Sequence, residues 1–462
     1  MSTQKKGLFI TNDGSNVMFT FILVSSLFFL WGFCNGMIDV MDKHFQEELG
    51  LSKAQSAWVQ FAHYLGYFLM SIPAGWLASK LGYKGGIIAG LLLVAVGGFW
   101  FIPATQINAM VKGGSVSPTS AFVAFLAGVC VIATGLTFLE TIANPYTTVL
   151  GDLRYAATRI NLAQSCNGVG WILGPIVGGM FFYGKDAAGR STGSETLYIP
   201  YAGIGVGVIL IAVIFYFANV PDIKMEDDYH LDDSAGSASH SIWSHPHFVM
   251  AVVAQFLYVA AQAGIFSFFI NYMTSEVPPI PGSWGGASGW LHSLVETNRA
   301  GLLSISNQGA STLASIGSTC FLIGRFTGAG LLRKYSAHKI LGIYGAANVL
   351  VTLLIFLKLG WLSVLCVFLS YFFMSIMFPT IFALGIFGLG ARAKTASAYI
   401  VMAIMGGALM PKLMGWVADT WDMSRGFIVP MFCFIFVAYY GFNWPKFSKA
   451  ESLSGVKVGS GH

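Results

Sequence analysis

About a dozen long apolar runs determine what this chain can fold into. Each has roughly 18 residues or more, enough to cross the roughly 30 Å hydrocarbon core of a bilayer as a helix. Of the 462 residues, 55% are hydrophobic and only 10% are charged, whereas about a quarter are charged in soluble proteins. The alternating segments of about ten residues that build membrane barrels are absent. We therefore predict an all-α, multi-pass membrane protein.

The apolar runs predict twelve transmembrane helices. They cover residues 17–41, 54–79, 84–104, 119–147, 159–183, 198–220, 247–275, 301–332, 337–357, 360–389, 394–418 and 425–445. An even number of helices places both termini on one side. Of the 25 Lys and Arg residues, 16 lie at the termini or in the loops on that side, and positive residues collect on the cytoplasmic face. We expect a plasma-membrane protein, in a bacterial inner membrane, with both termini cytoplasmic.

The first apolar run is preceded by Lys5 and Lys6. It is too long for the core of a signal peptide, and no small-residue cleavage pattern follows it. We therefore expect it to stay in the protein as the first helix.

Residues 221–246 separate the sixth and seventh predicted helices. They hold six acidic residues among Ser and Gly, a composition typical of a solvated cytoplasmic linker. The chain is accordingly predicted to have an N-terminal six-helix half, residues 1–220, and a C-terminal six-helix half, residues 247–462. A regulatory role for the acidic and histidine side chains of this segment is the alternative.

An internal repeat supports two related halves. The segment AGWLASKLGYK, residues 74–84, aligns without gaps with AGLLRKYSAHK, residues 329–339, and each segment follows the second helix of its half. Two ordinary basic loops would explain the charges but not the matched Gly and Lys positions. Parallel repeats of this kind are typical of transporters that bind substrate between their halves. We therefore predict two pseudo-symmetric halves.

Polar residues inside the apolar runs indicate a water-filled cavity. Glu140 and Asn144 share one helix face, and Gln164 and Asn167 share a face of the next helix. Ionisable groups that face lipid cost several kcal/mol, so such faces line a cavity instead. Other residues in the predicted spans could meet sugar hydroxyls or cover a sugar ring: Asn35, Gln60, Gln255, Tyr258, Gln262, Phe266 and Asn271.

The sequence suggests neither a metal centre nor an enzyme. All six cysteines fall within apolar runs and show no paired spacing, so no disulfide framework, metal site or cofactor is predicted. A membrane enzyme would need a nucleophile with a base, or a metal cluster, and the spans contain no such constellation.

Several stretches resemble a known transporter family. Residues 75–84 resemble the loop signature of the major facilitator superfamily, although Ser79 replaces the acidic residue that many members carry. Within that superfamily, further stretches are similar to the fucose, galactose and hexose permease branch, typified by L-fucose/proton symporters. They are SLFFLWGFCNGMIDV (26–40), FLETIANPYTTVLG (138–151), RINLAQSCNG (159–168), QFLYVAAQAGIFSFFINY (255–272), IGRFTGAGLL (323–332), SIMFPTIFALGIFGLG (375–390) and AYIVMAIMGGALMP (398–411).

The resemblance covers nearly the whole chain and implies a function. It implies the major facilitator fold and a secondary active transporter that imports a monosaccharide, L-fucose or a related hexose, by proton symport with alternating access. The implied partners are the sugar, the coupling ion and the lipid bilayer, with no nucleic acid, and we expect a monomer.

The resemblance also implies roles for individual residues. Acids matching Asp39 and Glu140 are associated with proton coupling and sugar binding in that branch, and amides matching Gln164 and Asn167 face the substrate. Burial favours the neutral form of a carboxyl group, so such a group can load and release a proton as access alternates. Glu140, deep in its run, is the better candidate, whereas Asp39 lies near the outer end of its helix. The structural alternatives are a Glu140 locked to Arg159 or to the backbone, and an Asp39 that serves as an interfacial anchor.

Departures from the branch pattern leave the substrate and the ion open. Gln262 stands where relatives often have an acid, His63 where an aromatic is common, and Lys412 where an apolar residue follows the proline. A sodium-coupled glucose, galactose or N-acetylhexosamine transporter is the first alternative, since carboxylates and amides also ligate sodium. A membrane sugar sensor that does not transport is the second. His63 could titrate near neutral pH or serve as a hydrogen-bonded packing residue.

Lys412 is a cation inside a predicted span. The helix boundaries put it in the outer part of the membrane, at a depth similar to Asp39 and Asp42. An unpaired ammonium group there must reach water or find a carboxylate. We expect Lys412 to pair with Asp39 or Asp42 when the outer gate is closed, and the alternative is simple snorkelling.

Overall fold

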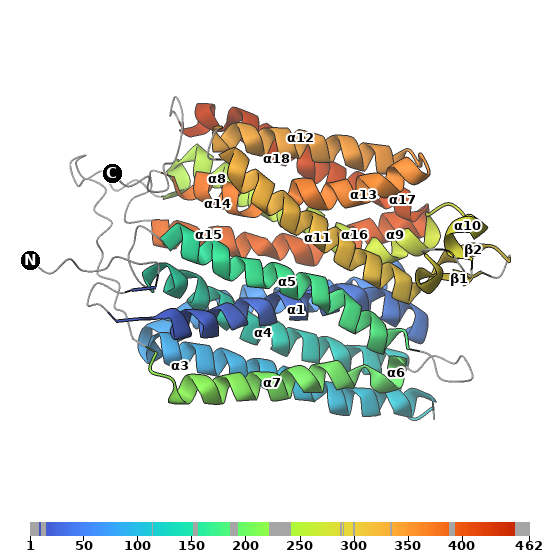
Figure 1. The fold of residues 1–462 in the computed structure, drawn as a ribbon, viewed down its shortest axis with the longest axis horizontal. Helices are drawn as coiled ribbons and strands as arrows, with labels where there is room; N and C mark the ends of the chain where they lie inside the picture. Colours follow the sequence, from blue (N-terminus) through green and yellow to red (C-terminus); the bar gives the residue numbers. More distant parts are fainter. Residues whose placement is uncertain are drawn as a thin grey trace, which may run out of the picture.

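The computed structural model describes most of the chain as a bundle of long helices (Figure 1). The described residues are 9–10, 15–112, 114–150, 156–184, 193–220, 242–286, 289, 291–298, 301–332, 335–387 and 393–448. Most of the predicted linker, residues 221–241, lies outside them.

Seven helices come from the N-terminal part of the chain. They are α1 (Met18–Leu49), α2 (Lys53–Ser56), α3 (Trp58–Lys112), α4 (Pro118–Val149), α5 (Ala156–Phe182), α6 (Gly193–Thr196) and α7 (Tyr198–Phe217). In Figure 1 they form one side of the bundle.

The remaining elements form the other side of the bundle (Figure 1). They are η2 (Ile242–Ser244), α8 (Pro246–Ser267), α9 (Phe269–Ser275), α10 (Gly282–Gly285), η3 (His292–Leu294), β1 (Val295–Thr297), β2 (Leu303–Ile305), α11 (Asn307–Leu332), α12 (Ala337–Phe356), α13 (Trp361–Met374), α14 (Met377–Ile386), α15 (Ala393–Met402), η5 (Ala403–Met405), α16 (Gly406–Thr420), α17 (Met423–Gly426) and α18 (Ile428–Ser448).

The described residues supply twelve membrane crossings, as predicted. Ten stretches are long and apolar enough to span a bilayer. The other two crossings are the first part of α3 and the more polar α11. α3 is in fact two helices joined at Gly82, whose backbone angles, φ 70° and ψ 177°, turn the chain back on itself.

The outward face of α7 is typical of a helix in contact with lipid. Val206, Leu210, Val213 and Phe217 recur at helical spacing and are 48 to 80% exposed, while Val208 on the opposite face is fully buried. An apolar stripe on the outside of a helix is stable only when its solvent is hydrocarbon. The pattern therefore agrees with a membrane setting.

Several predicted spans differ from the structure in detail, and three of them show why. α1 continues to Leu49, eight residues past its predicted end, because its last turns pack against the other side of the bundle. The predicted span 360–389 is divided into α13 and α14. The predicted helix 301–332 begins only at Asn307, because β2 pairs antiparallel with β1.

The end of the bundle that carries α6, α10 and the β1–β2 hairpin is called the hairpin end below (Figure 1, right). An ion-pair cluster stabilises it within the C-terminal half. Lys358 Nζ lies 2.9 Å from Asp422 Oδ2 and 3.3 Å from Glu276 Oε2. Burial raises the pKa of Asp422, but its bonds to Lys358 and to the Arg425 backbone outweigh burial and hold that pKa below its usual range. The cluster therefore loses its contribution to stability only as the pH falls through this lowered value.

We predict that Gly82→Ala lowers the stability of the fold. The backbone angles of Gly82 are in a region that essentially only glycine adopts, so a side chain there costs about 1 to 3 kcal/mol. The apparent melting temperature in detergent should fall clearly. Gly203→Ala is the matched control, because Gly203 is an exposed position of α7 with open space around it. Equal melting temperatures for the two variants would contradict the prediction.

Candidate functional site

A small cavity lies at the centre of the bundle, where helices of the two sides meet. α1 contributes Asp39 and Val40, α5 contributes Trp171 and Pro175, and the other side contributes Phe266, Ile270, Ala314, Ser318 and Tyr371. Its volume of about 10 Å³ admits about one water molecule, whereas ligand pockets commonly enclose about 300 to 1,000 Å³. The structure is therefore closed around this site.

Asp39 is the acidic group of the cavity. It is half-buried and accepts a 2.9 Å hydrogen bond from Gln60 Nε2. The Gln60 side chain, from α3, is 1% exposed. Asp39 is thus both oriented by a neighbouring amide and open to the cavity.

Glu140 lies in a separate polar cluster on the N-terminal side. The side chains of Trp31 and Tyr67 lie close enough to hydrogen-bond to its carboxyl group, and the single side-chain N–H of Trp31, on Nε1, donates to the Tyr67 hydroxyl. Asn35 Nδ2 donates to the Trp31 carbonyl oxygen at 2.7 Å. Aromatic donors from α1 and α3 therefore hold the carboxyl group of α4. The expected alternative partner, Arg159, has a side chain outside the described part of the chain.

Several buried polar atoms of α3, α5 and α8 have no hydrogen-bond partner among the described residues. They are His63 Nδ1, Asn167 Nδ2 and both polar atoms of the Gln255 amide. His63 and Asn167 are only 2% and 3% exposed. Since buried polar groups are almost always hydrogen-bonded, these atoms are available to a water molecule or a ligand. His63 also packs between the rings of Tyr64 and Tyr67, each with its centroid 5.1 Å away.

Aromatic rings connect the two sides of the bundle at the cavity. Trp171 of α5 meets Phe266 of α8 edge-on, with centroids 5.2 Å apart. Phe266 in turn stacks on Tyr371 at 4.3 Å. Such flat apolar faces suit the rings of sugars, but these faces also suit plain packing.

The other predicted residues take different positions. Gln164 and Gln262 are half-buried. Tyr258 is fully buried and its hydroxyl donates to the Met374 carbonyl oxygen at 3.0 Å, so it is bonded within its own half. The side chain of Asn144 lies outside the described part of the chain.

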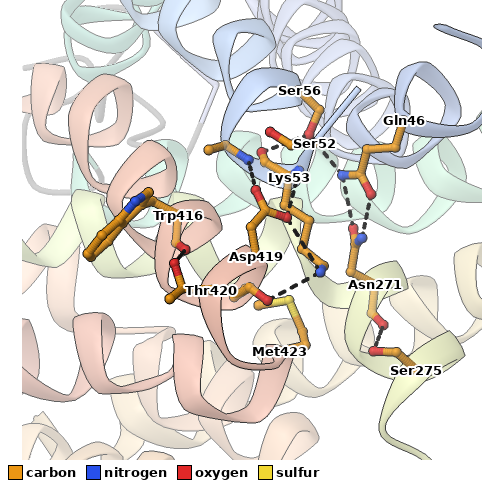
Figure 2. A network of polar contacts seen from close by, with 12 residues as sticks. Gln46, Ser52, Lys53, Ser56, Asn271, Ser275, Trp416, Asp419, Thr420 and Met423 are labelled. Atoms are coloured by element: carbon orange, nitrogen blue, oxygen red, sulfur yellow. Dashed lines mark hydrogen bonds and ion pairs between the residues drawn. The ribbon is translucent and has the colours of Figure 1, made fainter. Parts of the chain in front are cut away.

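Asn271 lies away from the cavity, in contacts that close the hairpin end (Figure 2). Its Nδ2 donates to Gln46 Oε1 at 2.6 Å, and Gln46 Nε2 donates to Ser56 Oγ at 2.8 Å. We call the set Gln46, Ser56, Asn271, Lys53 and Asp419 the hairpin-end latch.

Asp419 of α16 is the second connection of the latch (Figure 2). Its carboxylate accepts bonds from the backbone N–H groups of Lys53 and Ala54, at 3.0 and 2.8 Å. Lys53 Nζ lies 3.6 Å from the same carboxylate. The first N–H groups of a helix have no partner within it, so Asp419 satisfies those of α2. One carboxylate therefore joins the two sides of the bundle.

A polar vestibule of about 340 Å³ adjoins the latch. Lys43, Gln46, Glu47, Leu51, Ser52, Lys53, Asn271, Thr274, Ser275 and Asp419 line it. Glu47 here accepts bonds from Asn307 Nδ2 of α11 at 2.6 and 2.7 Å. Charge-assisted contacts of Glu47 and Asp419 thus border the vestibule.

The expected pairing of Lys412 with Asp39 or Asp42 is absent, although the hairpin end is closed. Lys412 is on the exposed face of α16, and its Nζ lies 3.8 Å from the centre of the Trp58 ring. Asp42 is fully buried, so an exposed ammonium group cannot reach it. A cation–π contact near the bundle surface replaces the predicted ion pair.

Sequence reasoning missed part of the site. Trp171 lies four residues after Asn167, and Tyr67 lies four after His63, so helical spacing could have placed both with residues already predicted. By contrast, Lys53 and Asp419 are 366 residues apart, and no local pattern connects them.

Comparison with known proteins decides the family. Residues 18–294 match the Major Facilitator Superfamily. The chain belongs to this superfamily. It is therefore a multi-pass membrane transporter and not an enzyme, and its fold consists of the two pseudo-symmetric six-helix halves predicted from the sequence.

Individual members of the superfamily align over almost their full length. The L-fucose-proton symporter of Escherichia coli is 33% identical over 434 residues, which cover 90% of each chain. The glucose/galactose transporter of Brucella abortus is 29% identical over 93% of this chain and 95% of its own. The crystal structure of FucP in the outward conformation superposes with a TM-score of 0.63 at 32% identity, covering 92% of this chain and 99% of that one.

We predict that Asp419→Ala loosens the hairpin-end latch. It removes two charge-assisted hydrogen bonds, each about 1.5 kcal/mol or more when buried. Because the side chain is 26% exposed, we expect a smaller net effect, a shift of about tenfold towards the open form. The readout is the rate at which an impermeant maleimide, added on the hairpin side, labels Ser56→Cys; the parent chain gives the background of the native cysteines.

Asp422→Ala is the matched control for this experiment. Asp422 also lies at the hairpin end, but its ion pairs join residues of one half only. Its loss should leave the labelling rate unchanged. Equal effects of the two alanine variants would mean that Asp419 has no special role in joining the halves.

Proposed function

We propose that this transporter imports a neutral monosaccharide together with protons, by alternating access. The observation that carries the proposal is the Asp39 carboxyl group in a closed cavity between the halves, beside the rings of Trp171, Phe266 and Tyr371. A carboxyl group can accept bonds from sugar hydroxyls, and an aromatic face can cover the sugar ring. The relatives' names, an L-fucose-proton symporter and a glucose/galactose transporter, support a hexose or deoxyhexose.

The donors around the two acids support a proton as the coupling ion. Asp39 accepts a hydrogen bond from the Gln60 amide N–H, and the donors of the Trp31 and Tyr67 side chains lie beside Glu140. A hard cation such as sodium needs several oxygen ligands at once. Donors aimed at a carboxylate compete with such a cation, whereas a carboxyl group that exchanges a proton needs no ligand shell.

The unpartnered buried amides support Asn167 as a substrate contact. A buried donor without a partner costs about 1 to 3 kcal/mol, and a sugar hydroxyl that bonds Asn167 Nδ2 would recover this cost. The unpartnered atoms of His63 in α3 and Gln255 in α8 would bond sugar hydroxyls in the same way. We assign Asn35, Gln60 and Gln164 to the lining, and Asn271 to the latch.

The proposed orientation makes the hairpin end the outer end. Lys80 and Lys84, at the turn inside α3, lie on the opposite side of the membrane, where positive residues mark the cytoplasm. Both termini are then cytoplasmic, in a bacterial inner membrane. We retain residues 1–220 and 247–462 as the halves, residues 221–246 as the linker, and a monomer as the functional unit.

Sugar uptake into proteoliposomes tests the proposal. A panel of monosaccharides is offered with an imposed pH gradient, an imposed sodium gradient, or neither. We expect accumulation of one sugar class with the pH gradient only. Accumulation that depends on the sodium gradient would identify sodium, and not the proton, as the coupling ion. Sugar binding without counterflow would identify a sensor that does not transport.

The same assay gives a prediction for Glu140→Gln. The amide keeps hydrogen bonds in the Trp31 and Tyr67 cluster but cannot carry a proton. Accumulation driven by the pH gradient should be lost, while counterflow of labelled sugar should remain at least in part. Normal accumulation by this variant would remove Glu140 from the coupling mechanism.

A second prediction concerns sugar affinity. Asn167→Ala and Gln164→Ala should each weaken binding by about 1 to 3 kcal/mol, because each removes a hydrogen-bonding group from a desolvated site. Isothermal titration with the transported sugar measures the change. Asn348→Ala is the matched control, since Asn348 is a fully buried, unpartnered amide of α12. Unchanged affinity in both site variants would show that the sugar binds elsewhere.

A further inference from the structure

Asp42 is the most completely enclosed acid among the described residues. Its side chain is 0% exposed, and neither carboxyl oxygen makes a hydrogen bond of good geometry, although the Gln60 and Ser267 side chains lie close to it. Asp39, one turn earlier on α1, differs in both respects, because it borders the cavity and bonds to Gln60. The proton-coupling proposal uses Asp39 and Glu140 and leaves Asp42 without a role.

No described cation balances a charge on Asp42. Lys43 pairs with Glu47 at 3.4 Å, Lys53 pairs with Asp419, and Lys412 covers the Trp58 ring. An isolated buried carboxylate costs far more than folding can supply, and such a group takes up a proton instead.

The other neighbours of Asp42 do not offset the effect of its burial. Among the described residues, the titratable side chains close enough to act on it are Asp39 on α1 and Tyr183 after α5. α3 and α8 add the neutral side chains of Gln60 and Ser267, whose donors favour the charged form less than burial and Asp39 oppose it. Asp42 is therefore neutral in this closed form.

The enclosure of Asp42 depends on contact between the halves. Ser267 belongs to the C-terminal half, and Gln46, one turn after Asp42 on α1, closes on Asn271 of the same half. When the hairpin end opens, α1 separates from α8 and α9, and water can reach the carboxyl group. A hydrated carboxyl group ionises readily at neutral pH.

We propose that Asp42 is an additional proton-binding residue, which must take up a proton before the hairpin end can close. The proton comes from water on the hairpin side, forms an O–H bond on the carboxyl group, and returns to the same side when that end reopens. Asp42 thus sets the pH dependence of closure, while the number of protons carried per sugar depends on other groups. The inference deepens the proposed function, because it rests on the same alternating access.

The direction of the pH effect follows from linkage. In the closed conformation Asp42 can only be neutral, whereas in the open conformation it can be neutral or ionised. Closure is therefore favoured at low pH and weakened as the pH rises, by up to about tenfold per pH unit for one linked proton.

Labelling of Ser56→Cys from the hairpin side, between pH 5.5 and 8.5 roughly, tests the proposal. Ser56 is fully buried in the closed latch. Each rate is divided by that of the same cysteine in the unfolded chain, because thiol reactivity itself rises with pH. With Asp42 present, the corrected rate should rise steeply with pH. Asp42→Asn should remove most of that rise and lower the rate at the alkaline end by about tenfold or more.

Two further variants make the outcome decisive. Asp42→Leu removes the ionisable group without adding a buried amide and should give the same flat profile, even if the buried amide of Asp42→Asn impairs folding. Asp39→Asn should retain the rise that depends on Asp42. A wild-type profile in both Asp42 variants, or a flat profile in Asp39→Asn alone, overturns the proposal.

The labelling test is separate from the proposed sugar symport. Sugar-induced proton uptake by the unmodified protein is measured in parallel. Its absence, with a labelling rate that still depends on Asp42, would reject proton symport and keep the role of Asp42. Normal proton uptake, with a labelling rate that does not depend on Asp42, would keep proton symport and reject the role of Asp42.

Discussion

A charged group inside this protein must find a partner, reach water or lose its charge, and much of the polar architecture follows from this requirement. Asp39 meets the Gln60 amide, and Glu140 meets two aromatic donors. Asp419 satisfies the first N–H groups of α2. Asp39 and Glu140 thus mark places where the interior had to be arranged around an acid. The hydrophobic parts of the helices impose no comparable demand and are specified mainly by length.

Close packing of helices supplies the frame in which these acids are held. α1 and α5 approach so closely that a Cβ atom on Gly170 would lie 2.3 Å from the Phe29 carbonyl oxygen. Lipid gives no hydrophobic drive for helices to associate, so small residues and van der Waals contact must hold them together. This seam lies within the N-terminal half, where a rigid body is needed if the halves are to rock as units.

Local properties of the sequence predicted the helices well and the connections between halves poorly. The span 337–357 was predicted from hydrophobic length and is observed as Ala337–Phe356, because that property is local. Asp39 and Phe266 were predicted as site residues and line the cavity, since helical periodicity places polar and aromatic side chains on an inner face. Lys412 was assigned to the wrong partner, because depth in the membrane does not reveal which way a side chain points around its helix. The Asp419 contact depends on how two distant segments meet, so only the folded chain reveals it.

The composition of the hairpin-end latch bears on how fast this protein can work. Gln46 and Asn271 form a pair of amides at the edge of the open, polar vestibule, where water can replace each bond as it breaks. A hydrogen bond exchanged for one to water changes the free energy by only about 1 kcal/mol. A cluster of apolar side chains at this position would seal more tightly, but every opening would expose apolar surface to water. A seal made of amides and one carboxylate trades tightness for rapid turnover, which suits a carrier that must reopen after every molecule it delivers.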